Sequence, residues 1–182
     1  MHEADNLFGA DADIIRGCIA GKARHQEALY RKYAPRMYAV CLRYARTAEA
    51  AADILQEGFV KVYRNLDRFR AEGSFEGWMR RIFVNTAIEH HRGRDLLTGT
   101  LTDREEQLDD GGWNAFDGLA LEDLLRMIAA LPDGYRTVFN LYVVEGYGHR
   151  EIADMLGISE GTSKSQLARA RKALQEMIRN SN

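Results

Sequence analysis

The sequence contains little cysteine and little proline, and each scarcity excludes a class of structure. The two cysteines among 182 residues, Cys18 and Cys41, cannot build a disulfide framework, and no CxxC pair or Cys/His cluster offers a zinc site. They are expected to be semi-buried thiols in a reducing compartment. The two prolines, Pro35 and Pro132, leave a chain rich in Ala, Leu, Arg and Glu almost free of helix breakers. The composition therefore predicts a mostly helical protein.

Long apolar runs and a large net charge are also missing. No hydrophobic stretch approaches the length that spans a membrane, and the acidic N-terminus has no signal-peptide pattern. We therefore expect a cytoplasmic protein that does not insert into membranes. Charged residues make up 29% of the chain, yet the formal net charge is only −2. Any nucleic-acid binding must be argued from local charge.

Three sections follow one another along the chain. Residues 11–94 keep a helical apolar period, residues 95–118 lose it, and residues 119–180 resume it. From Asp95 to Asp117 the middle section holds seven acids and one base, a net charge of −6. We interpret it as a linker. The predicted fold class is all-α, with two small helical domains joined by an acidic linker.

Capping residues mark the expected helix boundaries in the first section. Thr47 is predicted to cap a helix that continues to about Phe69, and Ser74 to cap another that continues to Arg94. Pro35 is expected to bend or restart the helix that precedes Thr47, because proline lacks a backbone N–H.

The third section is predicted to end in a helix-turn-helix, a motif that places one helix in the DNA major groove. Before it, one helix stops at Pro132, and Asp133 is the expected cap of the next. Within the motif, residues 147–174, Gly157 suits a left-handed turn and Ser159 suits the N-cap of a second, basic helix.

The second helix of this motif carries its positive charge on one side. From Glu160 to Asn182 there are five bases and two acids, a net charge of +3. On a wheel of about 100° per residue, Ser163 belongs to the apolar side and Lys164 to the opposite side. A solvated surface helix is the alternative, but the turn, the cap and the one-sided charge favour DNA binding. The predicted DNA-contacting residues are Lys164, Ser165, Ala168, Arg169 and Lys172.

A second basic surface is predicted on the helix that begins after Ser74. Four residues group on one flank of the wheel: Arg81, Asn85, Ile88 and Arg92. Arginine suits phosphates, and asparagine, a poor helix former, suits a base edge. With the Arg/Gly/Ser loop before the helix, this flank fits unpaired nucleic acid. The predicted contact residues are Arg70, Ser74, Arg81, Asn85 and Arg92.

The preceding helix carries a small polar patch. Asp53, Gln56 and Glu57 lie within one helical turn, so they can form a single exposed surface. One interpretation is a solvated helix face. The other is a docking surface for a protein that presents a basic or polar helix.

Taken together, these segments resemble a sigma factor of bacterial RNA polymerase, and most closely the extracytoplasmic function group. Residues 52–69 resemble the region-two helix that docks on the clamp of the polymerase largest subunit. Residues 73–94 resemble the segment that melts and reads the minus-ten promoter element. Residues 131–174 resemble region four, which binds the minus-thirty-five element and the polymerase flap.

The resemblance implies a role for each polar cluster. It places Asp53, Gln56 and Glu57 on clamp-contacting positions, and Asn85 on a position that reads the minus-ten strand. Recognition-helix positions are taken by Lys164, Ser165 and Arg169. Two residues depart from the pattern: Ser163 stands where many relatives have a β-branched residue, and Gln166 where many have arginine. The minus-thirty-five sequence is therefore left open.

The resemblance also implies partners and a mechanism without catalysis. The expected partners are the polymerase core, duplex promoter DNA and its opened single strand, and an inhibitory anti-sigma protein. Opening is expected to draw its energy from binding flipped bases and from the polymerase channel, without a cofactor. The acidic linker is expected to thread near the active-site and RNA-exit path, where a negative chain can mimic nucleic acid.

Two other functions compete with this one. A helix-turn-helix transcription regulator that does not bind core polymerase accounts equally well for the C-terminal section, but it leaves the patch at Gln56 and Glu57 without a role. An enzyme is the second alternative. Because no Ser/His/Asp set, phosphate loop or metal cluster occurs at suitable spacing, we expect neither an enzyme nor a metal site.

Overall fold

A computed structural model describes the backbone of residues 11–70, 72–98 and 121–181, and the side chains of residues 11–70, 72–90 and 123–181. Helices are the regular elements throughout these ranges, which contain no strand, and the all-α prediction is confirmed. The chain divides into two compact units, Met1–Ala87 and Ile88–Asn182. The predicted linker falls almost entirely outside the described residues. Within the described ranges no helix is both long enough and apolar enough to cross a bilayer.

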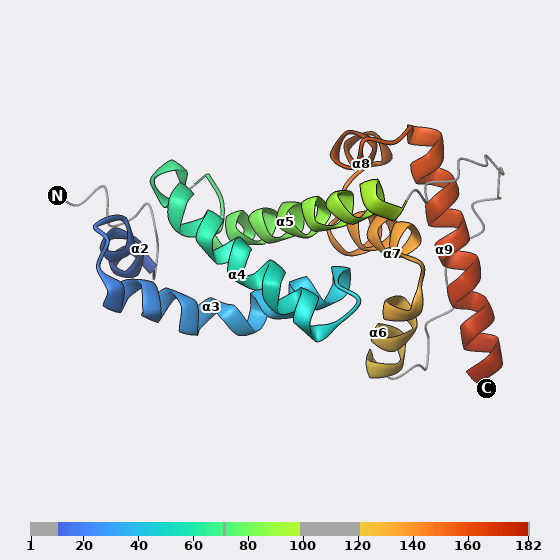
Figure 1. Ribbon diagram of the computed structural model, residues 1–182, viewed down its shortest axis with the longest axis horizontal. Helices are drawn as coiled ribbons and strands as arrows, with labels where there is room; N and C mark the ends of the chain where they lie inside the picture. The colour runs from blue at the N-terminus through green and yellow to red at the C-terminus, as the bar shows by residue number, and fades with distance from the viewer. Residues whose placement is uncertain (1–10, 71, 99–120, 182) are drawn as a thin grey trace. The chain divides into compact units, whose positions relative to one another are not determined.

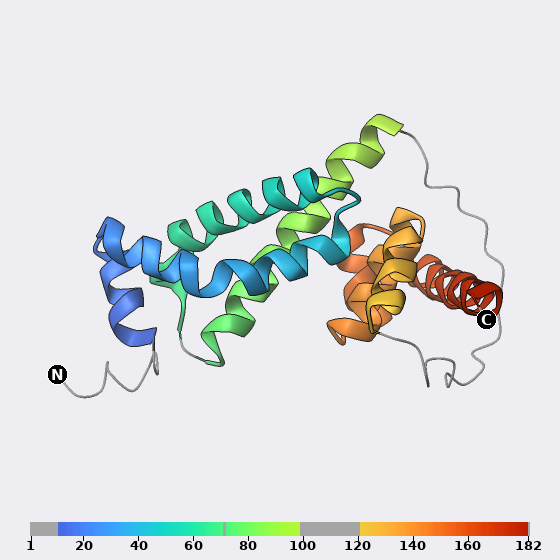
Figure 2. The ribbon, with the colours of Figure 1, turned by 90° about the horizontal axis from the view of Figure 1, so that it is seen from below.

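The first unit is built around a helical hairpin. The short helix α2 (Ala12–Ile19) precedes α3 (Ala23–Tyr44), and α3 is followed by α4 (Ala48–Asn65), which runs back along it (Figure 1). A single 3-10 turn, Leu66–Arg68, ends α4. Figure 2 shows α3 and α4 side by side, with the first part of α5 (Phe75–Thr98) at an angle to both.

The structure revises two expectations about these helices. Pro35 does not restart a helix, since α3 continues through it from Ala23 to Tyr44, and the alternative of a bend stays a prediction. Packing of the long α3 against α4 outweighs the local cost of the missing N–H. Helix α5 also ends at Thr98, four residues beyond the predicted end. By contrast, Thr47 caps α4 as predicted, with its hydroxyl accepting a hydrogen bond from the Ala50 N–H at 3.2 Å.

The core of the first unit brings α4 and α5 into close contact at a glycine. The ring of Phe83, which is fully buried, lies so close to Gly58 that a Cβ placed there would be 2.2 Å from a ring carbon. Phe83 also meets Phe59 edge-on at a centroid distance of 5.2 Å. The glycine therefore allows an approach that any side chain would block.

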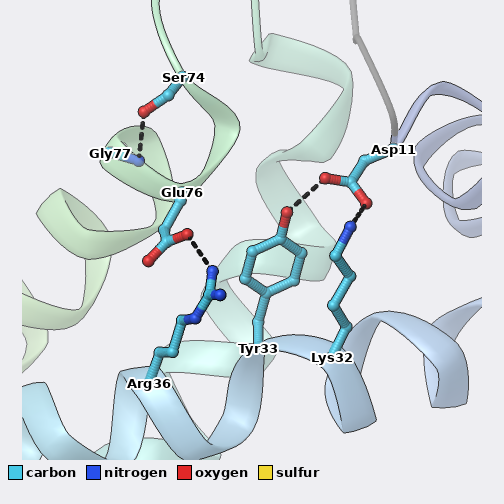
Figure 3. A network of polar contacts seen from close by, with 7 residues as sticks. All are labelled: Asp11, Lys32, Tyr33, Arg36, Ser74, Glu76 and Gly77. Carbon is cyan, nitrogen blue, oxygen red and sulfur yellow. Dashed lines mark hydrogen bonds and ion pairs between the residues drawn. The ribbon is translucent and has the colours of Figure 1, made fainter.

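Polar contacts tie the remaining elements to α3 (Figure 3). The carboxylate of Asp11, just before α2, accepts hydrogen bonds from the Tyr33 hydroxyl and from the Lys32 ammonium group. Burial, and then the neighbouring carboxylate, raise the pKa of Tyr33. One turn along α3, Arg36 donates to Glu76 in the first turn of α5 at 2.6 Å. These contacts fix α2 and the start of α5 against one face of α3.

Both cysteines lie in this unit as free thiols. Cys18 and Cys41 are fully buried, where semi-buried thiols were expected. Burial raises the pKa of the Cys41 thiol to about 12 and raises that of Cys18 as well. Both side chains are therefore small apolar core residues at neutral pH.

Residues 121–181 of the second unit form four α-helices. They are α6 (Leu121–Ala130), α7 (Asp133–Phe139), α8 (His149–Leu156) and the long α9 (Glu160–Ser181). A π-helical turn, Asn140–Val144, extends α7. Helix α9 packs against α7 and α8, and to a smaller extent against α6.

A buried arginine joins α6 to α7. Arg136 is 1% exposed, and its guanidinium donates to the carbonyl oxygens of Ala129 at 3.0 Å and Leu131 at 3.4 Å. It also donates to the Asp133 carboxylate at 2.6 Å. Asp133, expected to cap α7, is instead its first residue, and Pro132 holds the cap position. The carboxylate of Asp133 neutralises the buried guanidinium of Arg136, three residues further along the chain.

The contact at Gly58 leads to a stability prediction. Gly58→Ala places a methyl group against the buried Phe83 ring, and we expect the free energy of unfolding to fall by about 1–3 kcal/mol although alanine favours a helix. The control is Gly73→Ala, because a Cβ at Gly73 meets no atom within 4 Å. Urea unfolding followed by circular dichroism measures both variants. Equal stability of the two variants would contradict the packing described here.

Candidate nucleic-acid interface

The turn between α8 and α9 has the geometry of a helix-turn-helix. Gly157 adopts φ 70° and ψ 35°, the left-handed conformation predicted for it, and its N–H donates to the Ala153 carbonyl at 2.8 Å. Ser159 then caps α9, with its hydroxyl accepting from the Thr162 N–H at 2.9 Å. Both local predictions are confirmed.

One face of α9 is closed by packing. Its fully buried residues lie three or four positions apart: Ser163, Leu167, Ala170 and Leu174. Met177 and Ile178, predicted on the same side, are half-buried. Since the inner face is packed against the unit, the opposite face is the one that remains available to a ligand.

The five predicted DNA-contacting residues all retain exposure on α9. Lys164 and Lys172 are exposed, and Ser165, Ala168 and Arg169 are half-buried. The Ser165 hydroxyl donates to the Thr162 carbonyl at 3.0 Å, one turn back along the helix. In this position Ser165 keeps its lone pairs for a donor on a base edge.

An ion pair occupies the start of this face. The Lys164 ammonium group lies 2.8 Å from the Glu160 carboxylate, one turn away. The hydrogen bond and charge of Lys164 lower the pKa of Glu160, and the charge of Arg150 adds a smaller effect. Two bases from the N-terminal turns of α8 and α9 therefore act on one carboxylate. Arg150 was missed by the sequence interpretation, although a basic residue in the first turn of the motif is a visible signal.

Gln166 turns toward α7. A Cβ at Gly134, in the first turn of α7, would lie 2.9 Å from the Gln166 side-chain oxygen. The amide of Gln166 is thus held between α9 and α7. It lies beside the face of α9 that carries the predicted DNA-contacting residues, which is called the contact face below. This agrees with its position on the flank of the helical wheel.

The other predicted nucleic-acid residues lie in and after the loop before α5. Arg70, Ser74, Arg81 and Asn85 are all exposed, and the last two lie one turn apart on α5. Ile88, expected on the same flank, is buried. Arg92 also lies on α5, but its side chain is outside the described residues.

Aromatic rings hold both ends of this loop. Phe69 and Phe75 meet edge-on at 5.2 Å, and Trp78 stacks on Phe75 at 5.6 Å. Ser74 caps α5 as predicted, accepting from the Gly77 N–H at 3.0 Å (Figure 3). These contacts anchor both ends of the loop that carries Arg70 and Ser74.

The polar patch on α4 is exposed as predicted. Asp53, Gln56 and Glu57 all face solvent, and Glu57 pairs with Lys61 at 2.8 Å. Val60 lies on the same side of α4 and is 45% exposed, which the sequence interpretation missed. Its position, four residues after Gln56 and three after Glu57, was the sequence signal that it shares their side of the helix. The patch therefore combines polar groups with one apolar side chain.

No group of three or more His, Cys, Asp or Glu residues in the described part of the chain is arranged to hold a metal ion.

Comparison with known proteins assigns both units to one kind of protein. Residues 29–96 match the family model described as Sigma-70 region 2, and residues 121–174 match that described as Sigma-70, region 4. The RNA polymerase sigma-H factor of Pseudomonas aeruginosa is 30% identical over 93% of this chain and 96% of its own. The ECF RNA polymerase sigma factor SigW of Bacillus subtilis is 31% identical over 81% of this chain and 85% of its own.

The fold is also found among solved structures. The sigma factor RpoE from Bartonella quintana, in complex with the anti-sigma factor NepR, aligns with a TM-score of 0.52 at 21% identity. The alignment covers 86% of this chain and 98% of that one. At this identity the likeness concerns the fold.

The ion pair on α9 leads to a binding prediction. Glu160→Gln removes a negative charge from the contact face and releases Lys164, so we expect affinity for duplex DNA to rise about two- to fivefold. Glu176→Gln, which removes the same charge near the far end of α9, is the control and should change affinity little. Fluorescence anisotropy measures both variants. A loss of affinity in Glu160→Gln alone would instead make Glu160 a contact to a base.

Proposed function

The chain belongs to the sigma-70 family, in the extracytoplasmic function group, and we propose that its two units divide promoter recognition between them. As a sigma factor it directs RNA polymerase core to specific promoters. The observation that carries this function is the order of the two matches, region two followed by region four, on one chain. We propose domain limits of 11–94 and 119–180, with residues 95–118 as the linker, whose first four residues continue helix α5.

The second unit is proposed to hold duplex DNA at the minus-thirty-five element. Helix α9 would enter the major groove with the face opposite its buried side, and its N-terminal half would meet the base edges. Lys164 and Arg169 suit guanine edges or phosphates, and Ser165 can accept from a base donor. Ala168 allows close approach, and Lys172 lies further along for phosphate contact. Arg150, an exposed base in the first turn of α8, supports this orientation.

The region-two segment, which comprises the first unit and the rest of α5, is proposed to bind the opened strand of the minus-ten element. Asn85 would hydrogen-bond a base edge, while Arg81 and Arg92 would follow phosphates along α5. Arg70 and Ser74 would contact the strand from the loop, whose ends the aromatic rings anchor. Binding of unstacked bases supplies the free energy that keeps the strands apart.

Helix α4 is proposed to dock on the polymerase. Asp53, Gln56 and Glu57 would contact the clamp of the largest subunit, with Val60 as an apolar contact beside them. The region-four unit would contact the flap. An anti-sigma protein is a further proposed partner, as in the complex of RpoE with NepR. Because this chain is proposed to act on RNA polymerase, it is also proposed to reside in the cytoplasm.

In vitro transcription tests the function directly. Core polymerase supplemented with this chain should start transcription at a defined set of positions in a library of promoter fragments, and core alone should not. A helix-turn-helix regulator that does not bind core polymerase would bind DNA and leave initiation by core unchanged. That outcome would overturn the proposal.

The docking surface leads to a prediction with a closely matched control. Glu57→Gln removes a charge from the proposed clamp contact, and we expect affinity for core polymerase to fall about tenfold, equivalent to about 1.4 kcal/mol. Glu27→Gln is the control, because Glu27 also forms an exposed helical ion pair, with Arg31 at 2.7 Å, but lies on α3. Binding of labelled protein to core measures both. Equal losses would remove α4 from the interface.

A further inference from the structure

The inner face of α9 contains one polar side chain among apolar ones. Ser163 is 0% exposed and lies one turn before the buried Leu167. A hydroxyl taken out of water loses free energy unless a protein group replaces the lost hydrogen bonds. The oxygen of Ser163 lies 3.0 Å from Nδ1 of His149, which provides that replacement across the helix-turn-helix.

The imidazole of His149 contacts two elements besides its own helix: α9, through Ser163, and the π-helical turn, through Tyr142. His149 is the first residue of α8, and its ring stacks on Tyr142 of the π-helical turn at a centroid distance of 4.5 Å. The guanidinium of Arg171, on α9, lies over the Tyr142 ring at 5.9 Å. Stacking fixes the plane of the imidazole, and the fixed plane sets the direction from which Nδ1 meets Ser163.

This hydrogen bond lies directly beneath the residues proposed to read DNA. Lys164 and Ser165 follow Ser163, and on a helix each successive side chain is rotated by about 100°. A fixed direction for Ser163 therefore fixes the directions of both neighbours. The other fully buried residues of α9 are the apolar Leu167, Ala170 and Leu174. Their burial limits rotation of the helix, but a hydrogen bond depends on angle and so fixes the rotation more closely.

We propose that His149 is a positioning residue for promoter reading, acting through Ser163. Its hydrogen bond holds the N-terminal half of α9 at one rotation about the helix axis, so that Lys164 and Ser165 meet the base edges together. The inference rests on the proposed function of α9 and adds two residues that do not touch DNA themselves. Its effect is on discrimination between sequences more than on general attraction to phosphates.

A double-mutant cycle tests the proposal. His149→Phe keeps an aromatic ring for Tyr142 and removes Nδ1, and Ser163→Ala removes the hydroxyl. The measured quantity is the ratio of affinities for a duplex selected by the wild-type chain and for a scrambled duplex. Each single variant should lower this ratio about fivefold, the value of one hydrogen bond. The double variant should lower it no further, because either change breaks the same contact.

Two further variants separate positioning from folding. Ser181→Ala removes a hydroxyl that donates to the Met177 carbonyl near the end of α9, and it should leave the ratio unchanged. His149→Asn returns a hydrogen-bonding group near the position of Nδ1 and should restore part of the ratio. Thermal unfolding identifies any variant that has lost its fold. The affinity ratio of such a variant is set aside, and the partial recovery expected for His149→Asn then tests the positioning role.

The outcomes are distinguishable from failure of the proposed function. If the wild-type chain selects no duplex, the assignment of α9 fails and the inference fails with it. If the wild-type chain selects a duplex and the single variants keep the ratio within twofold, only the positioning role is overturned. Independent losses that multiply in the double variant overturn it as well.

Discussion

Burial of one side of a helix is the constraint on which the proposed contact surfaces of α9 and α4 depend. Along α9, Ser163, Leu167 and Ala170 are closed off from water, so the helix cannot rotate without exposing apolar surface and stranding a hydroxyl. The same holds for α4, where Ile54, Phe59 and Val62 are buried. The outward residues of each helix are thus placed by what lies beneath them.

The sequence was sufficient wherever structure follows from neighbouring residues. The caps at Thr47, Ser74 and Ser159 and the left-handed turn at Gly157 could be predicted, because each depends on a side chain and the backbone within one turn of it. The exposed polar patch on α4 and the outward residues of α9 could also be predicted, because helical spacing separates inner from outer positions. Their roles in binding remain predictions.

Features that depend on distant contacts were beyond reach. Helix α3 continues through Pro35 because packing along the hairpin outweighs the local cost of the missing N–H. The burial of Ile88 was missed because a helical wheel gives the angle of a side chain but not the width of the packed face. Arg136 shows that partners close in sequence can be equally hard to predict, because they come within reach only through the turn between two helices. Arginine is normally exposed, and only the meeting of α6 with α7 supplies the carbonyl groups that make its burial tolerable. The contact between His149 and Ser163 depends in the same way on how α8 and α9 meet.

The ion pair between Glu160 and Lys164 has a thermodynamic consequence for DNA binding. A lysine that meets phosphate normally displaces mobile cations from the DNA, and this release makes affinity depend steeply on salt concentration. Lys164 already has a counterion within the chain, the carboxylate of Glu160, 2.8 Å away. If α9 enters the major groove as proposed, phosphate replaces this carboxylate, which stays nearby and retains cations. Under that proposal the protein releases fewer ions on binding than its basic residues suggest, and its affinity for duplex DNA varies less with salt concentration.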